Sequence, residues 1–194
     1  MPSDKVIEEH YSWIDSELER MKKEEGVIWT AMTIHWPIWS TSDDHHDTKL
    51  LQTKLFKTLV KHKVDFFFAG HTHTMQYFNW PYDKELKYRN PVTDRNACHL
   101  DTEINVDKTH SQTFKQGEKL HHLIIGSTGK DHLSKVCTDY KKRTTGELSY
   151  ATNTHYTFAK VTVTSKAFTV KTYGRVDNDN SKKYKEIYTV TVEK

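Results

Sequence analysis

The chain has 194 residues, enough for one domain with a buried core or for part of a larger domain. Its net charge of +3 comes from 29 basic and 26 acidic residues spread along the sequence, so charge gives no case for a nucleic-acid partner. Aromatic residues make up 12%, which argues against disorder. No apolar run approaches the roughly 20 residues that span a bilayer, and the N-terminus has no apolar stretch that predicts a signal peptide.

The first part of the sequence predicts two helices and two strands. Apolar residues recur at steps of three and four over 3–24, which predicts a helix with one buried face. Residues 27–34 form an apolar, β-rich run that predicts a buried strand, and 41–47 are polar and predict a loop. A second helix is expected over 48–63, and a second short buried strand over 64–69. The buried face predicted for the second helix is Leu50, Leu51, Leu55, Phe56, Leu59 and Val60.

This strand–helix–strand order fixes the direction of the two strands. A crossover of this length implies parallel strands, joined in a right-handed way. Parallel strands end at the same edge of a sheet, and ligand and catalytic groups of open α/β sheets collect at that edge. We therefore expect the residues that follow 27–34 and 64–69 to lie close together.

The second part of the sequence predicts mostly strands. Residues 79–119 are polar without periodicity, which predicts an elaborated surface loop with a short hairpin. An apolar strand is expected over 120–125, and antiparallel strands with one face on a core over 156–164, 167–174 and 184–192. The first of these places Phe158, Lys160, Thr162 and Thr164 opposite Ala159, Val161 and Val163. The fold class is therefore α/β.

Histidines follow both strands of the parallel unit. Gly70-His71-Thr72-His73 comes directly after the strand 64–69, and His35-Trp36-Pro37 comes directly after the strand 27–34. In extended backbone, His71 and His73 point to the same side. A glycine at one bend allows a sharp turn with close approach, and a proline stiffens the other. Three imidazoles from two loops are therefore expected to converge, and histidine is the commonest metal ligand.

Each histidine also has a plainer interpretation. His71 and His73 taken alone match two exposed loop histidines, and a histidine at a strand end, such as His35, is often a hydrogen-bonded structural residue. The combination of two strand ends at one edge with three histidines favours a metal site over these alternatives. Cys98 and Cys137 leave two alternatives open, because they could form a disulfide in an oxidising compartment or remain free thiols.

The two histidine segments resemble a known family. IHWPIWS at 34–40 and AGHTHTMQYF at 69–78 are similar to the calcineurin-like metallophosphoesterases, and more closely to the tartrate-resistant, purple acid phosphatase branch. The resemblance covers about residues 10–78, weakens from 120 onwards and fails for 79–119. Ile34 departs from the small residue that the family usually has before its first histidine. The resemblance implies the C-terminal half of a metallophosphatase β-sandwich flanked by helices, with a polar insertion at about 79–119.

The resemblance also implies a role for each histidine. His35 and His71 would bind the second, exchangeable metal, and His73 the first, so that the intact centre holds Fe with Fe, Zn or Mn. A histidine a few residues past the Trp-Ser pair would face the substrate as proton donor or phosphate ligand. His45 or His46 falls there, although residues 43–47 also match a solvated polar loop.

The remaining ligands of the family are absent from this sequence. They are an aspartate, a bridging aspartate with a nearby tyrosine, and an asparagine followed by a catalytic histidine, all from upstream motifs. Two dications need anionic ligands, and neutral imidazoles cancel none of their charge. We therefore expect that this chain alone is incomplete and that an N-terminal half is its partner.

The expected activity of the intact protein is metal-dependent hydrolysis of phosphate monoesters. Two alternatives remain. One is a non-catalytic remnant or partner-binding module, and the other is a mononuclear, histidine-based metal-binding protein. The resemblance further implies a secretory or lysosomal location.

Overall fold

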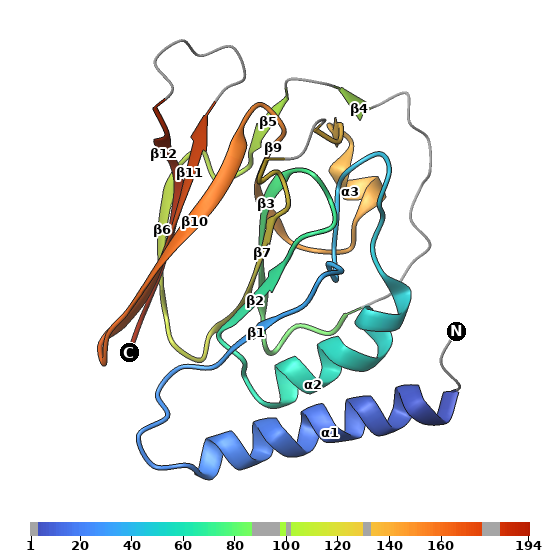
Figure 1. The fold of residues 1–194 in the computed structure, drawn as a ribbon, viewed down its shortest axis with the longest axis vertical. Helices are drawn as coiled ribbons and strands as arrows, with labels where there is room; N and C mark the ends of the chain where they lie inside the picture. Colours follow the sequence, from blue (N-terminus) through green and yellow to red (C-terminus); the bar gives the residue numbers. More distant parts are fainter. Residues whose placement is uncertain (1–3, 87–97, 100–101, 130–132, 176–182) are drawn as a thin grey trace.

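The computed structural model describes residues 4–86, 98–99, 102–129, 133–175 and 183–194, which form three layers (Figure 1). Two β-sheets pack face to face, and helices cover the outer face of the larger sheet. The helices are α1 Asp4–Lys23, the π-helix η1 Leu51–Leu55, α2 Phe56–Lys61 and α3 Tyr140–Arg143. This arrangement confirms the predicted α/β fold class, with a β-sandwich flanked by helices.

The larger sheet contains the predicted parallel unit. Its strands are β1 Ala31–Thr33, β2 Phe66–Ala69, β3 Met75–Pro81, β5 Glu103–Asn105, β7 Lys119–Ile125 and β9 Leu148–Thr152. Their order in the sheet is β1-β2-β7-β3-β9-β5. β1 pairs parallel with β2, and β2 pairs parallel with β7, whereas β3 is antiparallel to β7. The carboxyl ends of β1, β2 and β7 therefore meet at one edge, as the strand–helix–strand order predicted.

The smaller sheet contains the predicted antiparallel strands. Its order is β10-β11-β12-β6, with β10 Tyr156–Val163, β11 Ala167–Arg175, β12 Lys185–Glu193 and β6 Ser111–Lys115. β10, β11 and β12 are antiparallel neighbours, and β6 joins the sheet parallel to β12. A separate two-stranded ladder pairs β4 Cys98–His99 with β8 Val136–Cys137.

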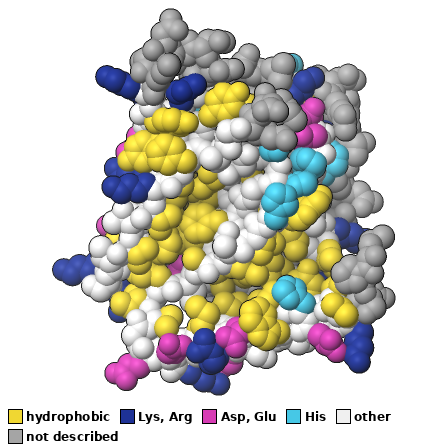
Figure 2. Space-filling model, in the orientation of Figure 1, with side chains coloured by type: hydrophobic (Ala, Val, Ile, Leu, Met, Phe, Trp, Pro, Cys, Tyr) yellow, Lys and Arg dark blue, Asp and Glu magenta, His cyan; other side chains and the backbone are white. Residues whose placement is uncertain are grey.

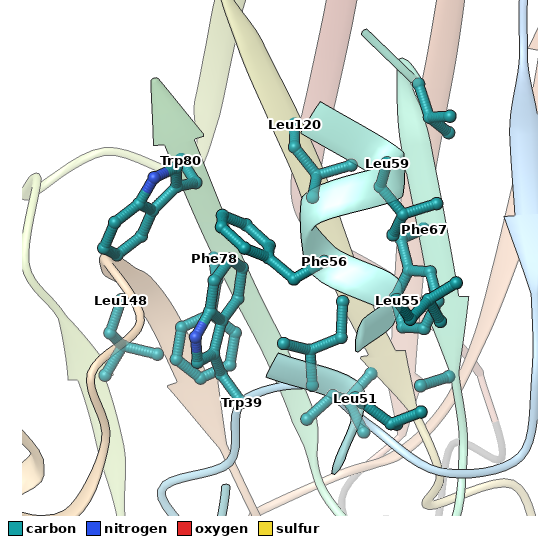
Figure 3. Packing of buried hydrophobic residues seen from close by; sticks show 14 of the residues in the cluster. Trp39, Leu51, Leu55, Phe56, Leu59, Phe67, Phe78, Trp80, Leu120 and Leu148 are labelled. Atoms are coloured by element: carbon teal, nitrogen blue, oxygen red, sulfur yellow. The ribbon is translucent and has the colours of Figure 1, made fainter. Parts of the chain in front are cut away.

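Two hydrophobic clusters hold the layers together. The outer cluster lies between the helices and the larger sheet and includes Trp39, Leu51, Leu55, Phe56, Leu59, Phe67, Phe78, Trp80, Leu120 and Leu148 (Figure 3). The inner cluster lies between the sheets and includes Phe66, Met75, Tyr77, Leu123, Tyr150, Phe168, Val170, Ile187, Tyr188, Val190 and Val192. Successive residues of a strand face opposite sides, so β2 buries Phe66 in one cluster and Phe67 in the other. This double burial explains the unbroken apolar run of β2.

A π-helical turn interrupts the helix predicted over 48–63. The turn η1 precedes α2, and α2 ends at Lys61. A π turn holds more residues than an α turn, so side chains before it are rotated away from the α-helical periodicity. Leu50, predicted to be buried, is 44% exposed, whereas Leu51 and Leu55 are buried. The predicted buried face is therefore wrong at Leu50.

The strand predicted over 27–34 is much shorter than expected. β1 has three residues, lies at the edge of the sheet, and exposes Ala31 and Thr33. Residues 27–30 instead tie the two sheets together, because the Trp29 indole Nε1 donates to the Thr164 carbonyl at 2.7 Å and the Thr30 amide donates to Asp65 Oδ2 at 2.8 Å. The prediction of a fully buried strand is therefore wrong.

Two further expectations differ from the structure. The stretch 79–119 is not a loop throughout, because its described residues include the end of β3 and the strands β5 and β6; residues 87–97 and 100–101 of it lie outside the described part. β10 was expected to bury one face, yet Val161 is 45% and Val163 is 52% exposed. β10 is an edge strand, and its end runs past the core.

Cys98 and Cys137 form a disulfide that joins β4 to β8. Of the two alternatives that the sequence left open, the structure therefore contains the disulfide.

None of the described helices is both long enough and apolar enough to cross a bilayer.

The sandwich is open along one side. The edge strands β1 and β10 lie on the same side of the two sheets (Figure 1), and hydrophobic side chains are visible between them (Figure 2). The side chains that pack against the inner cluster at this side are only partly buried, among them Trp29, Phe68 and Ala159. Two unpaired strand edges beside apolar surface are the features to which further strands add.

The loops at the strand ends approach one another very closely. A Cβ on Gly126, which follows β7, would lie 1.9 Å from the carbonyl oxygen of Thr72, whereas a Cβ on Gly70 would meet nothing nearer than 3.9 Å. The left-handed backbone occurs at His71, with φ 61°. The close approach expected at Gly70 is therefore made by Gly126, and His71 adopts a conformation that few non-glycine residues adopt, rather than the extended one that was expected.

Two adjacent histidines of β7 are buried in the core. His121 accepts or donates a hydrogen bond with the Tyr77 hydroxyl at 2.8 Å, while neither ring nitrogen of His122 has a hydrogen-bond partner among the described residues. Burial lowers the pKa of each imidazole to about 3. Both rings are therefore neutral in the folded chain at neutral pH.

His122→Leu should reduce the loss of stability in mild acid. The unfolded histidine binds a proton below about pH 6.5 and the folded one does not, so each such residue lowers the free energy of unfolding by up to about 1.4 kcal/mol per pH unit as the pH falls. We expect urea unfolding at pH 7, 6 and 5 to show a shallower decline in the variant. An identical decline in both proteins would contradict the burial of an unprotonated His122.

Gly126→Ala should destabilise the chain, and Gly70→Ala should not. A methyl group at Gly126 would overlap the Thr72 carbonyl, so the backbone at one of these residues would have to shift. Such overpacking costs about 1–3 kcal/mol or more, because the site relaxes only by moving its neighbours. The methyl group at Gly70 meets only ordinary contacts, so its effect should stay within about 1 kcal/mol. Urea unfolding measures both, and a larger loss in Gly70→Ala would overturn this assignment.

Candidate functional site

Histidines from two loops line one hollow at the carboxyl edge of the larger sheet. The hollow has a volume of about 480 Å³, and its described lining is His35, His45, Gly70, His71, His73, Ile125, Gly126, Thr128 and Gly129. His35 follows β1, His71 and His73 follow β2, and the glycines 126 and 129 follow β7. The structure thus brings together the three histidines that the sequence proposed as metal ligands, and histidine side chains gather at the upper right of the face in Figure 2.

His71 lies at the centre of this group. Its Nδ1 is 3.0 Å from His35 Nε2, and its Nε2 is 3.1 Å from His45 Nδ1. A neutral imidazole has one donor and one acceptor nitrogen, so His71 can satisfy both contacts with a single proton. His35, His71 and His45 therefore form a chain of three hydrogen-bonded rings.

Trp36 fixes the plane of the His71 ring. The two ring centroids are 3.6 Å apart with a tilt of 30°, and Trp36 also meets the His45 ring edge-on at 6.1 Å. Trp36 is 49% exposed, so one face of this indole covers the histidine while the other faces solvent. Such a contact limits the rotation of His71, whose backbone is already held in the left-handed region.

The surroundings of His71 favour its neutral form. Burial lowers the pKa of the His71 imidazole, and the neighbouring His45 and His35 lower it further, against a smaller opposing effect of Asp44. A metal ion binds the neutral imidazole, so a lowered pKa keeps the lone pair of His71 available at a lower pH than usual.

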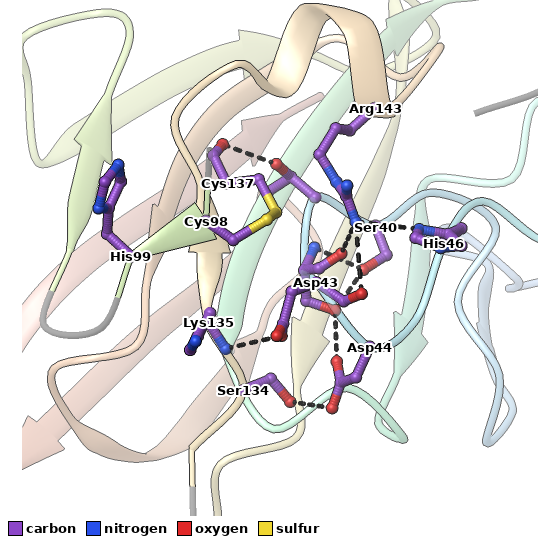
Figure 4. The surroundings of a disulfide bond; sticks show 12 residues. Ser40, Asp43, Asp44, His46, Cys98, His99, Ser134, Lys135, Cys137 and Arg143 are labelled. Atoms are coloured by element: carbon purple, nitrogen blue, oxygen red, sulfur yellow. Dashed lines mark hydrogen bonds between the residues drawn. A yellow bond between two sulfur atoms is a disulfide. The ribbon is translucent and has the colours of Figure 1, made fainter. Parts of the chain in front are cut away.

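The two loop histidines face different directions. The His45 ring points into the hollow, whereas His46 Nδ1 lies 3.2 Å from Nη2 of the buried Arg143, which also donates to the Ser42 carbonyl at 2.9 Å. Of the two residues that the sequence proposed to face the substrate, only His45 borders the described hollow. Figure 4 shows the Arg143 side chain reaching towards His46.

The loop that carries His45 is packed rather than solvated. Ser40, Thr41 and Ser42 are buried, and the buried carboxylate of Asp47 accepts five hydrogen bonds. The donors are the Ser40 amide, the Gln52 side chain, the Thr144 hydroxyl, and the amide and hydroxyl of Thr145, at 2.7–3.0 Å. Burial raises the pKa of Asp47, and these donors act in the opposite direction. A polar sequence is buried here because its own groups satisfy one another.

Asp44 is the carboxylate nearest to the histidine chain. Its Oδ2 accepts from the Ser134 hydroxyl at 2.8 Å and lies 3.7 Å from His45 Nε2, and its Oδ1 accepts from the Ser42 hydroxyl at 2.9 Å. Burial acts to raise the pKa of Asp44, but the two hydroxyls and His45 outweigh it, and the pKa is lowered. Asp44 is therefore an anion held beside the site.

Sequence reasoning missed four contributors to the site. They are Trp36, Asp44, Gly126 and Ser134. Trp36 and Asp44 lie inside the segments already singled out, so only their contacts were unknown. Gly126 begins a Gly-Ser-Thr-Gly strand exit, which was a usable signal. Ser134 lies far from both histidine segments along the chain, and no pattern around it indicates a role in the site.

The donor set suits one metal ion better than two. His35, His71 and His73 offer three nitrogens, the ligand type that zinc and iron take in proteins. In the described part of the chain, however, no three His, Cys, Asp or Glu side chains already stand in a metal-binding arrangement, since His71 directs both nitrogens at other rings. No carboxylate is among the described lining residues of the hollow. The site has nitrogen ligands without the anionic ligands that a pair of metals requires.

Comparison with known proteins gives partial matches in sequence. No family model matches the chain. Purple acid phosphatase 21 of Arabidopsis thaliana is 28% identical over 85 residues, 43% of this chain, and probable purple acid phosphatase 20 is 25% identical over 87 residues, also 43%. The Fe(3+)-Zn(2+) purple acid phosphatase 12 is 31% identical over 67 residues, 34% of this chain. These matches span 19%, 20% and 14% of the relatives' own lengths, so the chain covers a fifth of each relative or less.

Comparison of structures covers nearly the whole chain. The purple acid phosphatase PPD1 from yellow lupin seeds has a TM-score of 0.58 and 18% identity, covering 94% of this chain and 28% of that protein. GAP50, described as the anchor in the inner membrane complex of Plasmodium, has a TM-score of 0.59 and 15% identity, covering 97% of this chain and 43% of that protein. In sequence over part of its length and in fold over nearly all of it, the chain is purple acid phosphatase-like, which confirms the branch that its two histidine segments indicated.

Proposed function

We propose that this chain supplies the histidine half of a dinuclear metal site that hydrolyses phosphate monoesters. The observation that carries the proposal is the hollow at the carboxyl edge of the larger sheet, where His35, His71 and His73 meet. His35 and His71 would hold the exchangeable metal and His73 the iron, with Fe, Zn or Mn as the second metal. The relatives support the reaction class, since those named here are phosphatases and one is described as a Fe(3+)-Zn(2+) enzyme.

The anionic ligands would come from another polypeptide segment. Two dications a few ångströms apart repel each other strongly unless an anion bridges them. Asp47 is engaged with five donors, and Asp44 with two serine hydroxyls, so neither is offered to the hollow. The matched relatives are about five times longer than the matched stretch, which leaves room for such a segment in them. We infer that the rest of a purple acid phosphatase fold supplies it.

The open side of the sandwich is where we place this partner. Among the described strands, none pairs with the outer edge of β1 or of β10, apolar surface lies between these edges, and the histidine loops follow β1 and β2. Strands added to those edges would cover the apolar surface and bring new loops to the carboxyl edge of the larger sheet. One docking event would thus complete the core and the site.

His45 is the residue we assign to proton transfer. Metals, when bound, supply Lewis acidity towards the phosphoryl oxygens and the attacking water. His45 borders the hollow, with Asp44 beside its Nε2 and His71 beside its Nδ1. Once a metal held His71, Nδ1 of His45 would be released from that contact and would be the nitrogen that gives a proton to the leaving alcohol. Trp36 and the low pKa of His71 keep that ring oriented and neutral. His46 is turned to Arg143 and has no part in this scheme.

A second candidate is a binding module without catalysis. It is favoured by the likeness of fold to GAP50, which is described as an anchor, and by the lack of an assembled metal-ligand group among the described residues. A mononuclear metal-binding protein is the third reading, because three imidazoles suffice for one ion.

The chain alone should bind at most one divalent ion and release negligible phosphate from an aryl phosphate. Three neutral imidazoles can hold one ion, whereas a second ion meets Coulomb repulsion without a bridging anion. Calorimetric titration with Zn²⁺ measures the stoichiometry. His71→Ala should abolish binding, and the matched His46→Ala should keep it, because His46 faces away from the hollow.

Adding the remaining part of a purple acid phosphatase fold should restore a second metal and hydrolysis together. In that assembly His45→Ala should lower turnover and His46→Ala should not. Efficient turnover by residues 1–194 alone would overturn the half-site proposal, and binding of one ion without any restored hydrolysis would favour the mononuclear reading.

A further inference from the structure

Ser134 is bonded to the second histidine loop through both its backbone and its side chain. The Ser134 amide donates to the His73 carbonyl at 3.2 Å, and the His73 amide donates to the Ser134 hydroxyl oxygen at 3.3 Å. The Ser134 carbonyl accepts from the Asn153 side chain at 3.0 Å, and Ser134 is 3% exposed. The serine is therefore fixed in place, and it fixes His73.

The same hydroxyl reaches the first histidine loop. Ser134 Oγ donates to Asp44 Oδ2 at 2.8 Å, and that oxygen lies 3.7 Å from His45 Nε2 (Figure 4). The other oxygen of Asp44 accepts from Ser42, so the carboxylate is held at both ends. His45 is thereby placed with Nε2 towards the carboxylate and Nδ1 towards His71.

We infer that Asp44 and Ser134 are a positioning pair that sets His45 and His73 relative to each other. The roles assigned to the two histidines rest on the proposed function, whereas the connection between their loops rests on the hydrogen bonds of Ser134 and Asp44. His45 and His73 come from loops that follow different strands, and each loop could move with its own strand. A carboxylate or hydroxyl beside a ligating or reacting histidine commonly orients it, and its loss weakens metal binding roughly 10–100-fold.

The disulfide holds the segment that carries Ser134. Cys137 is joined to Cys98, its amide donates to the Thr41 carbonyl at 3.0 Å, and the Asp43 amide donates to the Lys135 carbonyl at 3.1 Å. The segment from Ser134 to Cys137 thus runs beside the loop that carries His45. Ser134 is therefore held by this ladder in addition to its hydrogen bonds with His73.

Three variants and one control test the pair in the full chain. Ser134→Ala and Asp44→Asn remove the hydroxyl donor and the anion, and Ser134→Thr keeps the hydroxyl. Asp43→Asn is the matched control, because Asp43 Oδ1 accepts from the Lys135 amide at 3.0 Å and ties the same two segments without touching a histidine. Urea unfolding checks that all four variants fold.

Nuclear magnetic resonance of the metal-free chain gives the first measurement. Ser134→Ala should shift the ring signals of His45, and Asp44→Asn should shift the backbone amide signal of His73. Each substitution should thus change a signal in the loop that it does not directly alter. Ser134→Thr should restore the His45 signals, and Asp43→Asn should leave both histidines unchanged. If Asp43→Asn shifts them as much as the other two variants, or if neither variant acts across the loops, the positioning pair is refuted.

Titration with Co²⁺ gives the second measurement. Asp44→Asn and Ser134→Ala should weaken binding roughly tenfold or more, with Asp43→Asn within about twofold of the unaltered chain. Equal affinity in all variants would refute the pair. If the unaltered chain binds no Co²⁺, the proposed metal site fails, and the resonance measurement still decides on the pair.

Discussion

The parallel pairing of β1 with β2, and of β2 with β7, is the constraint on which the rest of this structure depends. It brings three strand ends to one edge, where each contributes something different. β1 leads to His35, β2 leads to His71 and His73, and β7 leads to Gly126, whose missing side chain leaves room for the histidine loop. Antiparallel pairing of β1 and β2 would have placed the histidine segments at opposite ends of the sheet.

The carboxylates and the imidazoles at this edge have different roles. The described carboxylates nearest the hollow serve to hold loops, Asp47 through five donors and Asp44 through two serine hydroxyls. The titratable groups among the described lining of the hollow are imidazoles, and burial together with neighbouring rings lowers the pKa of His71. Such a surface can offer nitrogen ligands to a cation but cannot neutralise two of them. We propose that a segment docking on the open side between β1 and β10 would supply these anions.

The sequence correctly predicted those parts of the fold in which the local hydrophobic pattern and the topology agree. The run VDFFFA and the two histidine segments predicted a parallel unit and a shared edge, and both are present. It failed where a tertiary contact decides: Leu50 is exposed by a π turn, and β1 is cut short because Trp29 and Thr30 tie the sheets together. The polar loop before Asp47 looks solvated in sequence, and only its mutual hydrogen bonds reveal burial. Ser134 could not be found, since no pattern links it to His73.

Zinc K-edge X-ray absorption of the chain with one equivalent of Zn²⁺ tests whether His35, His71 and His73 form one half of a metal centre. If they do, about three imidazole nitrogens should lie at roughly 2.0–2.1 Å from the zinc, with the remaining positions filled by water or another light ligand. His73→Ala should remove one of these nitrogens and His46→Ala none. A zinc shell with one imidazole or none, or an unchanged shell in His73→Ala, would contradict this assignment.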